Sequence, residues 1–283
     1  MEVMIPNLEY LHLANNDIKE LPIGFSLQYE LKTLNVDNTG LTELPSGIYY
    51  SRIVSLSAAN NSITEVPFHI DNMGYCEYLN FSGNDITSLP ITVGKLGNLR
   101  HLNVNYNALT GLPDFDPNLS KIELLYARAN NITAIPPTLG ASVTIKELDL
   151  TLNRLTNVPS DFGSMYFDYC GLSFNYLDIS PGSSTLATLQ AIGGDVEYMP
   201  QIEPPKGLTA VAEENAVALT WNACPEGSFD AGDMQVESYS VYAINGTVEK
   251  LGELPATVLT YTHQNPTPDT AYTYRVTVKY KIN

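Results

Sequence analysis

The chain has 283 residues, with 31 Asp and Glu against 14 Lys and Arg, which gives a formal net charge of −17. This balance excludes nucleic acid as a partner, because binding a phosphate backbone requires clustered Lys and Arg side chains. No apolar run of about 18 residues occurs, so we expect no membrane span, and the start of the chain does not read as a signal peptide.

One short pattern recurs nine times between Leu8 and Pro200. The first copy reads L-E-Y-L-H-L-A-N-N-D-I-K-E-L-P, and every copy ends in Pro. The copies begin at Leu8, Leu31, Ile53, Cys76, Leu99, Ile122, Ile145, Phe167 and Leu186. The template L-x-x-L-x-L-x-x-N-x-L-x-x-L-P resembles the leucine-rich repeat. The resemblance implies an α/β-type solenoid with a parallel β-sheet on its concave face and a mostly irregular convex side.

Each repeat supplies one short strand, numbered here by its position in the template. Positions 4 and 6 point inward, whereas positions 3, 5 and 7 face the concave surface, since side chains alternate across a strand. The Asn at position 9 can satisfy backbone groups that the turn leaves unpaired. These Asn side chains form a ladder of hydrogen bonds along the repeats. Thr39 and Gly194 replace Asn in repeats two and nine, so we expect the ladder to be interrupted there. Cys76 and Cys170 fall on core positions and are expected to be free thiols.

The repeats occupy residues 1–200, and a second domain is expected over residues 201–283. Met1–Pro6 reads as the tail of an earlier repeat, so we expect the natural chain to extend upstream, with any export signal there. The Pro-rich segment Gln201–Pro205 predicts a stiff linker. Period-two runs then predict strands at Ala216–Trp221, Ser238–Ile244, Val258–His263 and Thr270–Val278.

The second domain resembles the fibronectin type III family. The resemblance rests on P-P-K-G-L from Pro204, L-T-W ending at Trp221, Y-S-V from Tyr239 and T-A-Y-T-Y-R-V from Thr270. It implies an all-β sandwich with Trp221 in the core and Tyr272 as the tyrosine corner, its final strand missing from this chain. Leucine-rich repeats followed by such a module resemble secreted or surface-anchored bacterial proteins, particularly those of Bacteroidota.

The sequence offers no catalytic, metal or cofactor site. His12 and His101 share the concave face, but they lie four repeats apart, or ~19 Å at ~4.8 Å per strand. No nucleotide-binding Gly-rich loop is present. Glu147 and Asp149 lie beside Arg128, and we interpret them as a surface ion cluster in which Arg128 pairs with Asp149. The chain is therefore expected not to be an enzyme.

The concave face of repeats four to eight is the predicted ligand-binding surface. Its aromatic side chains lie among amides and charges, and Tyr provides large contact area at low entropic cost. The alternative is that these exposed positions merely tolerate such residues. The candidate ligand-binding residues are Tyr78, Asn80, His101, Asn103, Asn105, Tyr126, Arg128, Glu147, Asp149 and Tyr169.

The expected function is therefore non-enzymatic recognition of a protein or peptide, outside the cell or on its surface. Two alternatives stay open. Tyr with Asn and Asp also suits a glycan, although the face carries no Trp. The repeats could also be the targeting part of a larger enzyme or effector.

Overall fold

A computed structural model describes residues 7–22, 30–116, 118–141, 144–199, 201–202, 205–224, 226–229, 232–268 and 270–282. The chain divides into two compact units, Met1–Gln201 and Ile202–Asn283. The predicted upstream repeat tail at Met1–Pro6 and part of the predicted linker lie outside the described residues.

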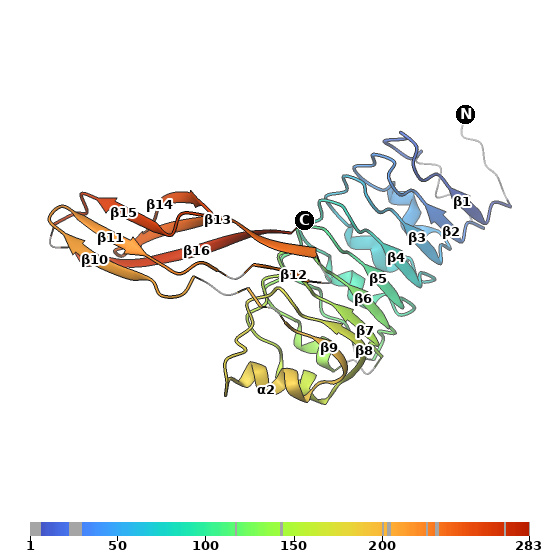
Figure 1. The fold of residues 1–283 in the computed structure, drawn as a ribbon. Coiled ribbons are helices and arrows are strands. Elements are labelled where there is room, and N and C mark those ends of the chain that lie inside the picture. Colours follow the sequence, from blue (N-terminus) through green and yellow to red (C-terminus); the bar gives the residue numbers. More distant parts are fainter. Residues whose placement is uncertain are drawn as a thin grey trace. The chain divides into compact units, whose positions relative to one another are not determined.

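The first unit is built on a nine-stranded parallel sheet whose strands follow one another in chain order (Figure 1). Each strand comes from one repeat, and equivalent leucines pair in register, as Leu79 does with Leu102 and Leu102 with Leu125. The predicted solenoid with a parallel sheet is confirmed. The strands are β1 (Tyr10–His12), β2 (Thr33–Asn35), β3 (Ser55–Ser57), β4 (Tyr78–Asn80), β5 (His101–Asn103), β6 (Leu124–Tyr126), β7 (Glu147–Asp149), β8 (Tyr166–Gly171) and β9 (Gly193–Glu197).

The inward leucines stack into one continuous core. Position 4 is at most 1% exposed from Leu34 to Leu148, whereas Leu11, on the first strand of the sheet, is only half-buried. One repeat cannot bury three apolar side chains alone, so neighbouring repeats on both sides complete the burial. Cys76 and Cys170 are buried free thiols, as predicted, and burial raises the pKa of each to about 12.

The position-9 Asn side chains join successive repeats. Asn130 donates through Nδ2 to the carbonyls of Val104 and Ala127, at 2.9 and 3.1 Å, and its Oδ1 accepts from Leu109 N at 2.9 Å. Where Thr39 replaces Asn, its hydroxyl donates to Val36 O at 2.7 Å instead. This bond stays within repeat two, and the Thr39 side chain makes no bond to repeat one among the described residues, so the side-chain ladder is interrupted there, as predicted.

Short helical turns form much of the convex side. Several begin directly after the closing Pro, whose φ near −65° suits a helix start but prevents continuation of a strand. The brief helical turns predicted for these segments are confirmed. They are η2 (Ser46–Tyr50), η3 (Phe68–Asn72), η4 (Ile91–Lys95), α1 (Pro137–Gly140), η5 (Ser160–Ser164) and α2 (Ser184–Ala191).

The ninth repeat begins later in the chain than the template predicted. Leu186, the expected start of the repeat, lies inside α2, and the strand is β9, in which Val196 pairs with Cys170. The last convex segment is therefore longer than the others rather than shorter. Gln201 then occupies position 9: its Nε2 donates to Leu172 O at 3.0 Å, and its Oε1 accepts from Leu177 N at 3.1 Å. The ladder is not interrupted at Gly194, because that residue is not in the ladder.

The second unit contains two antiparallel sheets that share one core. The first has the order β10–β11–β15, and the second joins β12, β13 and β14, with β16 also paired to β13. Leu219 of β11 and Trp221, the residue directly after that strand, pack in one cluster with Tyr239, Val241 and Val276 from the second sheet. The bounds are β10 (Thr209–Glu213), β11 (Ala216–Thr220), β12 (Gly227–Phe229), β13 (Gly232–Ile244), β14 (Val248–Pro255), β15 (Thr260–Gln264) and β16 (Thr273–Ile282).

All four strands predicted for this unit are present, while β10, β12 and β14 were not predicted. Trp221 is buried, as expected. The Tyr272 hydroxyl accepts from Thr267 N at 3.2 Å, which ties the start of β16 to the chain five residues upstream. That contact is the one expected of a tyrosine corner.

Candidate ligand-binding surface

The predicted ligand-binding residues lie side by side on the concave face of β4 to β8. The strand register places Tyr78 beside His101, and Asn103 beside Tyr126. Neighbouring strands are ~4.8 Å apart, so these side chains form one surface. They are half-buried rather than fully exposed, because each leans on the same column in the next repeat.

Tyr78, His101 and Tyr126 form what we call the aromatic cluster. The His101 ring lies edge-on to both tyrosines, with centroid distances of 4.5 Å to Tyr78 and 5.2 Å to Tyr126. Edge-to-face contacts of this kind are favourable beyond the area they bury. The sequence placed Tyr126 in a different column from the other two, and the structure brings it across diagonally onto His101.

His101 is the polar centre of this cluster. Its Nε2 is buried and has no hydrogen-bond partner among the described residues. Burial lowers the pKa of His101 below its ordinary value, and the nearby Glu147 carboxylate opposes that shift. The ring is therefore a neutral, partly desolvated group at neutral pH.

Two tyrosines each hold a carboxylate of the following strand. Tyr126 Oη donates to Glu147 Oε2, and Tyr169 Oη donates to Glu197 Oε2 at 3.2 Å. Burial and then neighbouring carboxylates raise the pKa of both hydroxyls, to about 12 for Tyr169. Glu197 was not among the predicted site residues, because the misplaced ninth repeat had removed it from the concave columns.

Some predicted ligand-binding residues have a structural role that the sequence did not reveal. Asn80, Asn103 and Asp149 each accept, through Oδ1, the backbone N–H two residues later, at 2.9 to 3.1 Å. Where position 5 is Tyr126, Asn105 of the preceding repeat supplies the acceptor, for Arg128 N at 2.7 Å. These Asn and Asp side chains end the strands, so their presence alone does not indicate a ligand.

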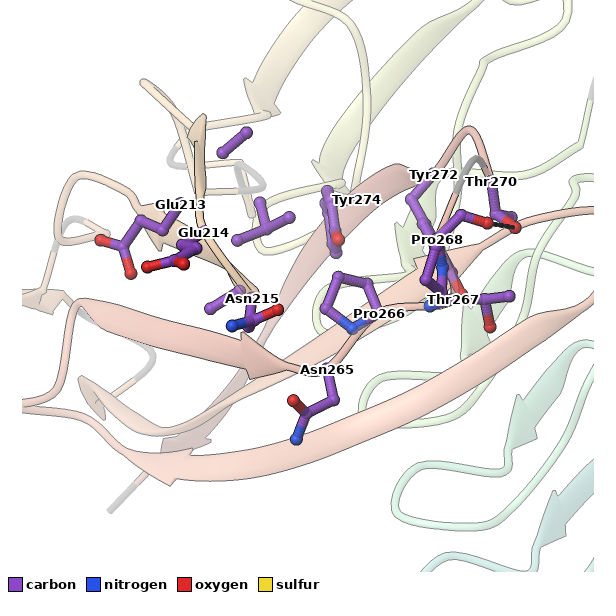
Figure 2. A pocket seen from close by; sticks show the side chains of 13 residues that line it. Glu213, Glu214, Asn215, Asn265, Pro266, Thr267, Pro268, Thr270, Tyr272 and Tyr274 are labelled. Carbon is purple, nitrogen blue, oxygen red and sulfur yellow. Dashed lines mark hydrogen bonds between the residues drawn. The ribbon is translucent and has the colours of Figure 1, made fainter.

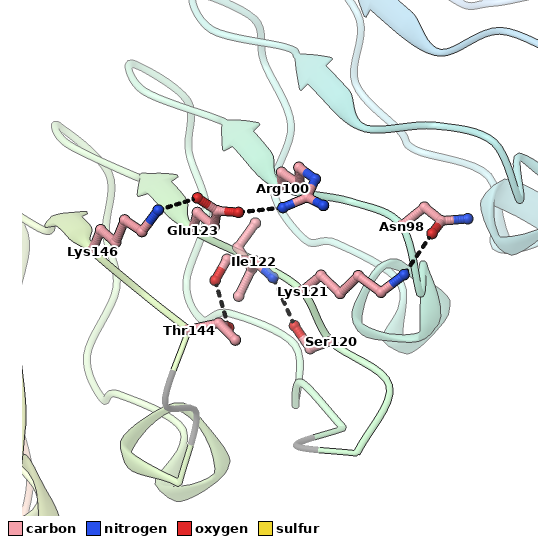
Figure 3. Close-up of polar contacts among 8 residues, drawn as sticks. All are labelled: Asn98, Arg100, Ser120, Lys121, Ile122, Glu123, Thr144 and Lys146. Atoms are coloured by element: carbon pink, nitrogen blue, oxygen red, sulfur yellow. Dashed lines mark hydrogen bonds and ion pairs between the residues drawn. The ribbon is translucent and has the colours of Figure 1, made fainter.

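The charges beside the sheet are arranged differently from the predicted ion cluster. At position 2, Glu123 accepts from both Arg100 and Lys146, joining repeats five to seven (Figure 3). On the concave face, by contrast, neither Glu147 nor Asp149 forms an ion pair among the described residues. The predicted Arg128–Asp149 pair is therefore wrong. Glu147 instead accepts from Tyr126, and Asp149 Oδ1 accepts from Thr151 N.

A pocket of about 480 Å³ lies in the second unit (Figure 2). Its polar groups have structural partners: Tyr272 binds Thr267 N, and the Tyr274 hydroxyl lies 3.0 Å from His263 Nδ1. Glu213 and Glu214 also line the pocket. In the described parts of both units, no group of three His, Cys, Asp or Glu side chains could hold a metal ion. No helix there is long and apolar enough to cross a membrane.

The comparisons with known proteins agree with this architecture. The leucine-rich repeat family model matches residues 7–27. A probable serine/threonine-protein kinase of Dictyostelium discoideum is 32% identical over 68 residues, which cover 23% of this chain and 5% of that protein. The name kinase describes that protein, and the match spans only a small fraction of its length.

Solved structures of similar fold include a plant and a bacterial protein. The plant peptide hormone receptor RGFR1, in complex with RGF2, is similar with a TM-score of 0.55 and 22% identity, over 64% of this chain and 30% of that one. A Shigella effector leucine-rich repeat domain is similar with a TM-score of 0.51 and 23% identity, over 68% and 82% respectively. The repeats of the first unit form a leucine-rich repeat solenoid built on a parallel β-sheet.

Proposed function

We propose that the chain is a recognition protein that binds a protein or peptide on the concave face of its repeats, without catalysis. The aromatic cluster carries this proposal. Tyr78, His101 and Tyr126 are held against one another on a surface that the core does not need, and each stays partly accessible. Pre-ordered aromatic side chains lose little entropy on binding, which suits a binding hot spot.

The similar structures support this reading by analogy. RGFR1 is described as a peptide hormone receptor in complex with RGF2, and the Shigella protein as an effector domain. Both share the solenoid with this chain. We extend the same kind of role, a peptide or protein ligand, to this chain. We place the protein outside the cell or on its surface, with the second unit a fibronectin type III-like spacer.

The test begins with a protein and glycan array probed with the whole chain. A protein or peptide hit is expected, and its dissociation constant is then measured against a variant of the aromatic cluster. Tyr126→Ala should weaken binding at least ~30-fold, since truncating an aromatic anchor typically costs ~2 kcal/mol. The thermal midpoint should change little.

Thr33→Ala is the control, because Thr33 is a partly exposed residue of β2, outside the aromatic cluster. It should leave binding unchanged. Equal binding by Tyr126→Ala and wild type, or a ligand mapped to the convex turns or to the second unit, would exclude the concave site. Hits confined to glycans would replace a protein ligand by a carbohydrate on the same face.

A further inference from the structure

We infer that protonation of His101 opens the aromatic cluster, so that the concave site binds its ligand at neutral pH and releases it in mild acid. This inference rests on the proposed concave-face function and names a regulation of that same site. It concerns β4 to β7, where the cluster and its neighbouring carboxylate lie.

His101 holds the aromatic cluster together. Its ring meets Tyr78 on the strand before it and Tyr126 on the strand after it, edge to face, at centroid distances of 4.5 and 5.2 Å. The two tyrosines lie two strands apart, or ~9.6 Å, so the His101 ring is the contact that joins them. A change that moves this one ring therefore releases both tyrosines.

The surroundings of the His101 ring suit its neutral form. Both ring nitrogens of an imidazolium carry a proton and act as donors. His101 Nε2 is buried and has no hydrogen-bond partner among the described residues. A charged donor without an acceptor costs more free energy than a neutral one, so the protonated ring is stable only where water reaches Nε2. Turning the ring out to water breaks its contacts with both tyrosines.

The groups around the ring do not compensate the added charge. Tyr78 on β4 and Tyr126 on β6 have hydroxyl pKa values raised by burial, so both are neutral between about pH 5 and pH 8. Among the described residues, Glu147 on β7 is the carboxylate whose charge acts on His101, and its Oε2 already accepts from Tyr126 Oη. Burial outweighs this attraction and holds the pKa of His101 below its ordinary value of 6.5. The ring is therefore neutral at neutral pH and takes up a proton in acid.

The first test needs no ligand. Nuclear Overhauser effects between ring protons of His101 and Tyr78 should be present at about pH 7.5 and lost at about pH 5, once the His101 ring has titrated. The His101 resonance is assigned as the one that is absent in His101→Phe. Overhauser effects that persist after His101 is protonated would overturn the inference, because the ring would then accept the charge without leaving the cluster.

The second test measures binding. A random peptide display library is selected against the whole chain at about pH 7.5, and the dissociation constant of the strongest peptide is measured down to about pH 5. Each pH unit below the pKa of His101 should weaken binding about tenfold, because only the neutral ring keeps the site ordered. The Phe side chain of His101→Phe cannot titrate, so the affinity of this variant, whatever its value at neutral pH, should not show this dependence.

His12→Phe is the matched control. His12 is an exposed residue of β1 on the same concave face, outside the aromatic cluster. This variant should keep the wild-type dependence on pH. Because one peptide is used throughout, its own titration is the same for all three proteins.

The outcomes distinguish this inference from the proposed function. A peptide that loses affinity in Tyr126→Ala, but binds wild type equally at both pH values, overturns the regulation and leaves the concave site standing. A pH dependence that persists in His101→Phe also overturns it. Peptides insensitive to Tyr126→Ala, or a folded chain that selects no peptide, count against both proposals.

Discussion

The residue before the ladder position has the same unusual backbone in every one of the first eight repeats. At position 8, φ lies between 52° and 66°, in the left-handed region. The residue's N–H donates to a carbonyl of the following repeat, as Ala129 N does to Thr151 O at 2.9 Å. Asn and Gly adopt this conformation readily, but Ala129 and Leu152 do not, so those repeats carry local strain.

Because of this strain, we expect substitutions at two equivalent positions to change the stability of the protein in opposite directions. Ala129→Gly should stabilise the protein by about 1 kcal/mol, because Gly has no Cβ to oppose a positive φ. Gly83→Ala should destabilise it by more than about 1 kcal/mol, since the new Cβ would also meet Asn60 Oδ1 at 2.4 Å. Urea denaturation midpoints measure both. A loss of stability in Ala129→Gly would contradict the explanation.

At the scale of the element, the ninth repeat shows how the solenoid keeps its pattern when the spacing changes. The helix α2 is inserted before β9, yet the strand still pairs with β8, and Gln201 still reaches the carbonyl that an Asn would reach. Gln is one methylene longer than Asn, and its amide has the same donor and acceptor. The ladder therefore depends on the amide group more than on the Asn residue.

Two glutamines distinguish the observed ninth repeat from the template's prediction. Gln201→Ala should cost about 2–4 kcal/mol, because Leu172 O and Leu177 N would lose a buried partner. Gln190→Ala, on the exposed side of α2, should change the free energy of unfolding by no more than ~0.5 kcal/mol. Chemical denaturation compares them. A larger loss of stability in Gln190→Ala than in Gln201→Ala would contradict the observed repeat and favour one that begins at Leu186.

At the scale of the whole repeat unit, stability is distributed along the stack. Each repeat contacts its two neighbours, so a core side chain in the middle is enclosed on both sides while one at the first strand is not. Leu102 is 1% exposed, whereas the equivalent Leu11 is half-buried. The same substitution should therefore have different costs at the two positions.

Leu102→Ala should destabilise the protein by about 2–5 kcal/mol, since its neighbours cannot relax into the cavity. Leu11→Ala should cost clearly less, because water already reaches that site. The free energies of unfolding from urea titration give the comparison. Equal losses for the two variants would show that the stack does not enclose its middle more tightly than its first strand.

The sequence alone determined the solenoid and most of its surface. The repeat period and the alternation of apolar residues determine which side chains point inward, so the parallel sheet, the buried leucines and the concave columns of eight repeats were predictable. Four of the seven strands described in the second unit followed from the same alternation. These features depend on local periodicity, which is complete within each repeat.

The tertiary structure decided what the periodicity does not specify. The ninth strand follows pairing with β8 rather than the nearest match to the template, because a strand in this sheet must satisfy its neighbour's hydrogen bonds. The same register placed Glu197 beside Gly171, on the concave face. It also brought Tyr126 onto His101. Contacts between repeats determine these roles, and one repeat's sequence does not contain them.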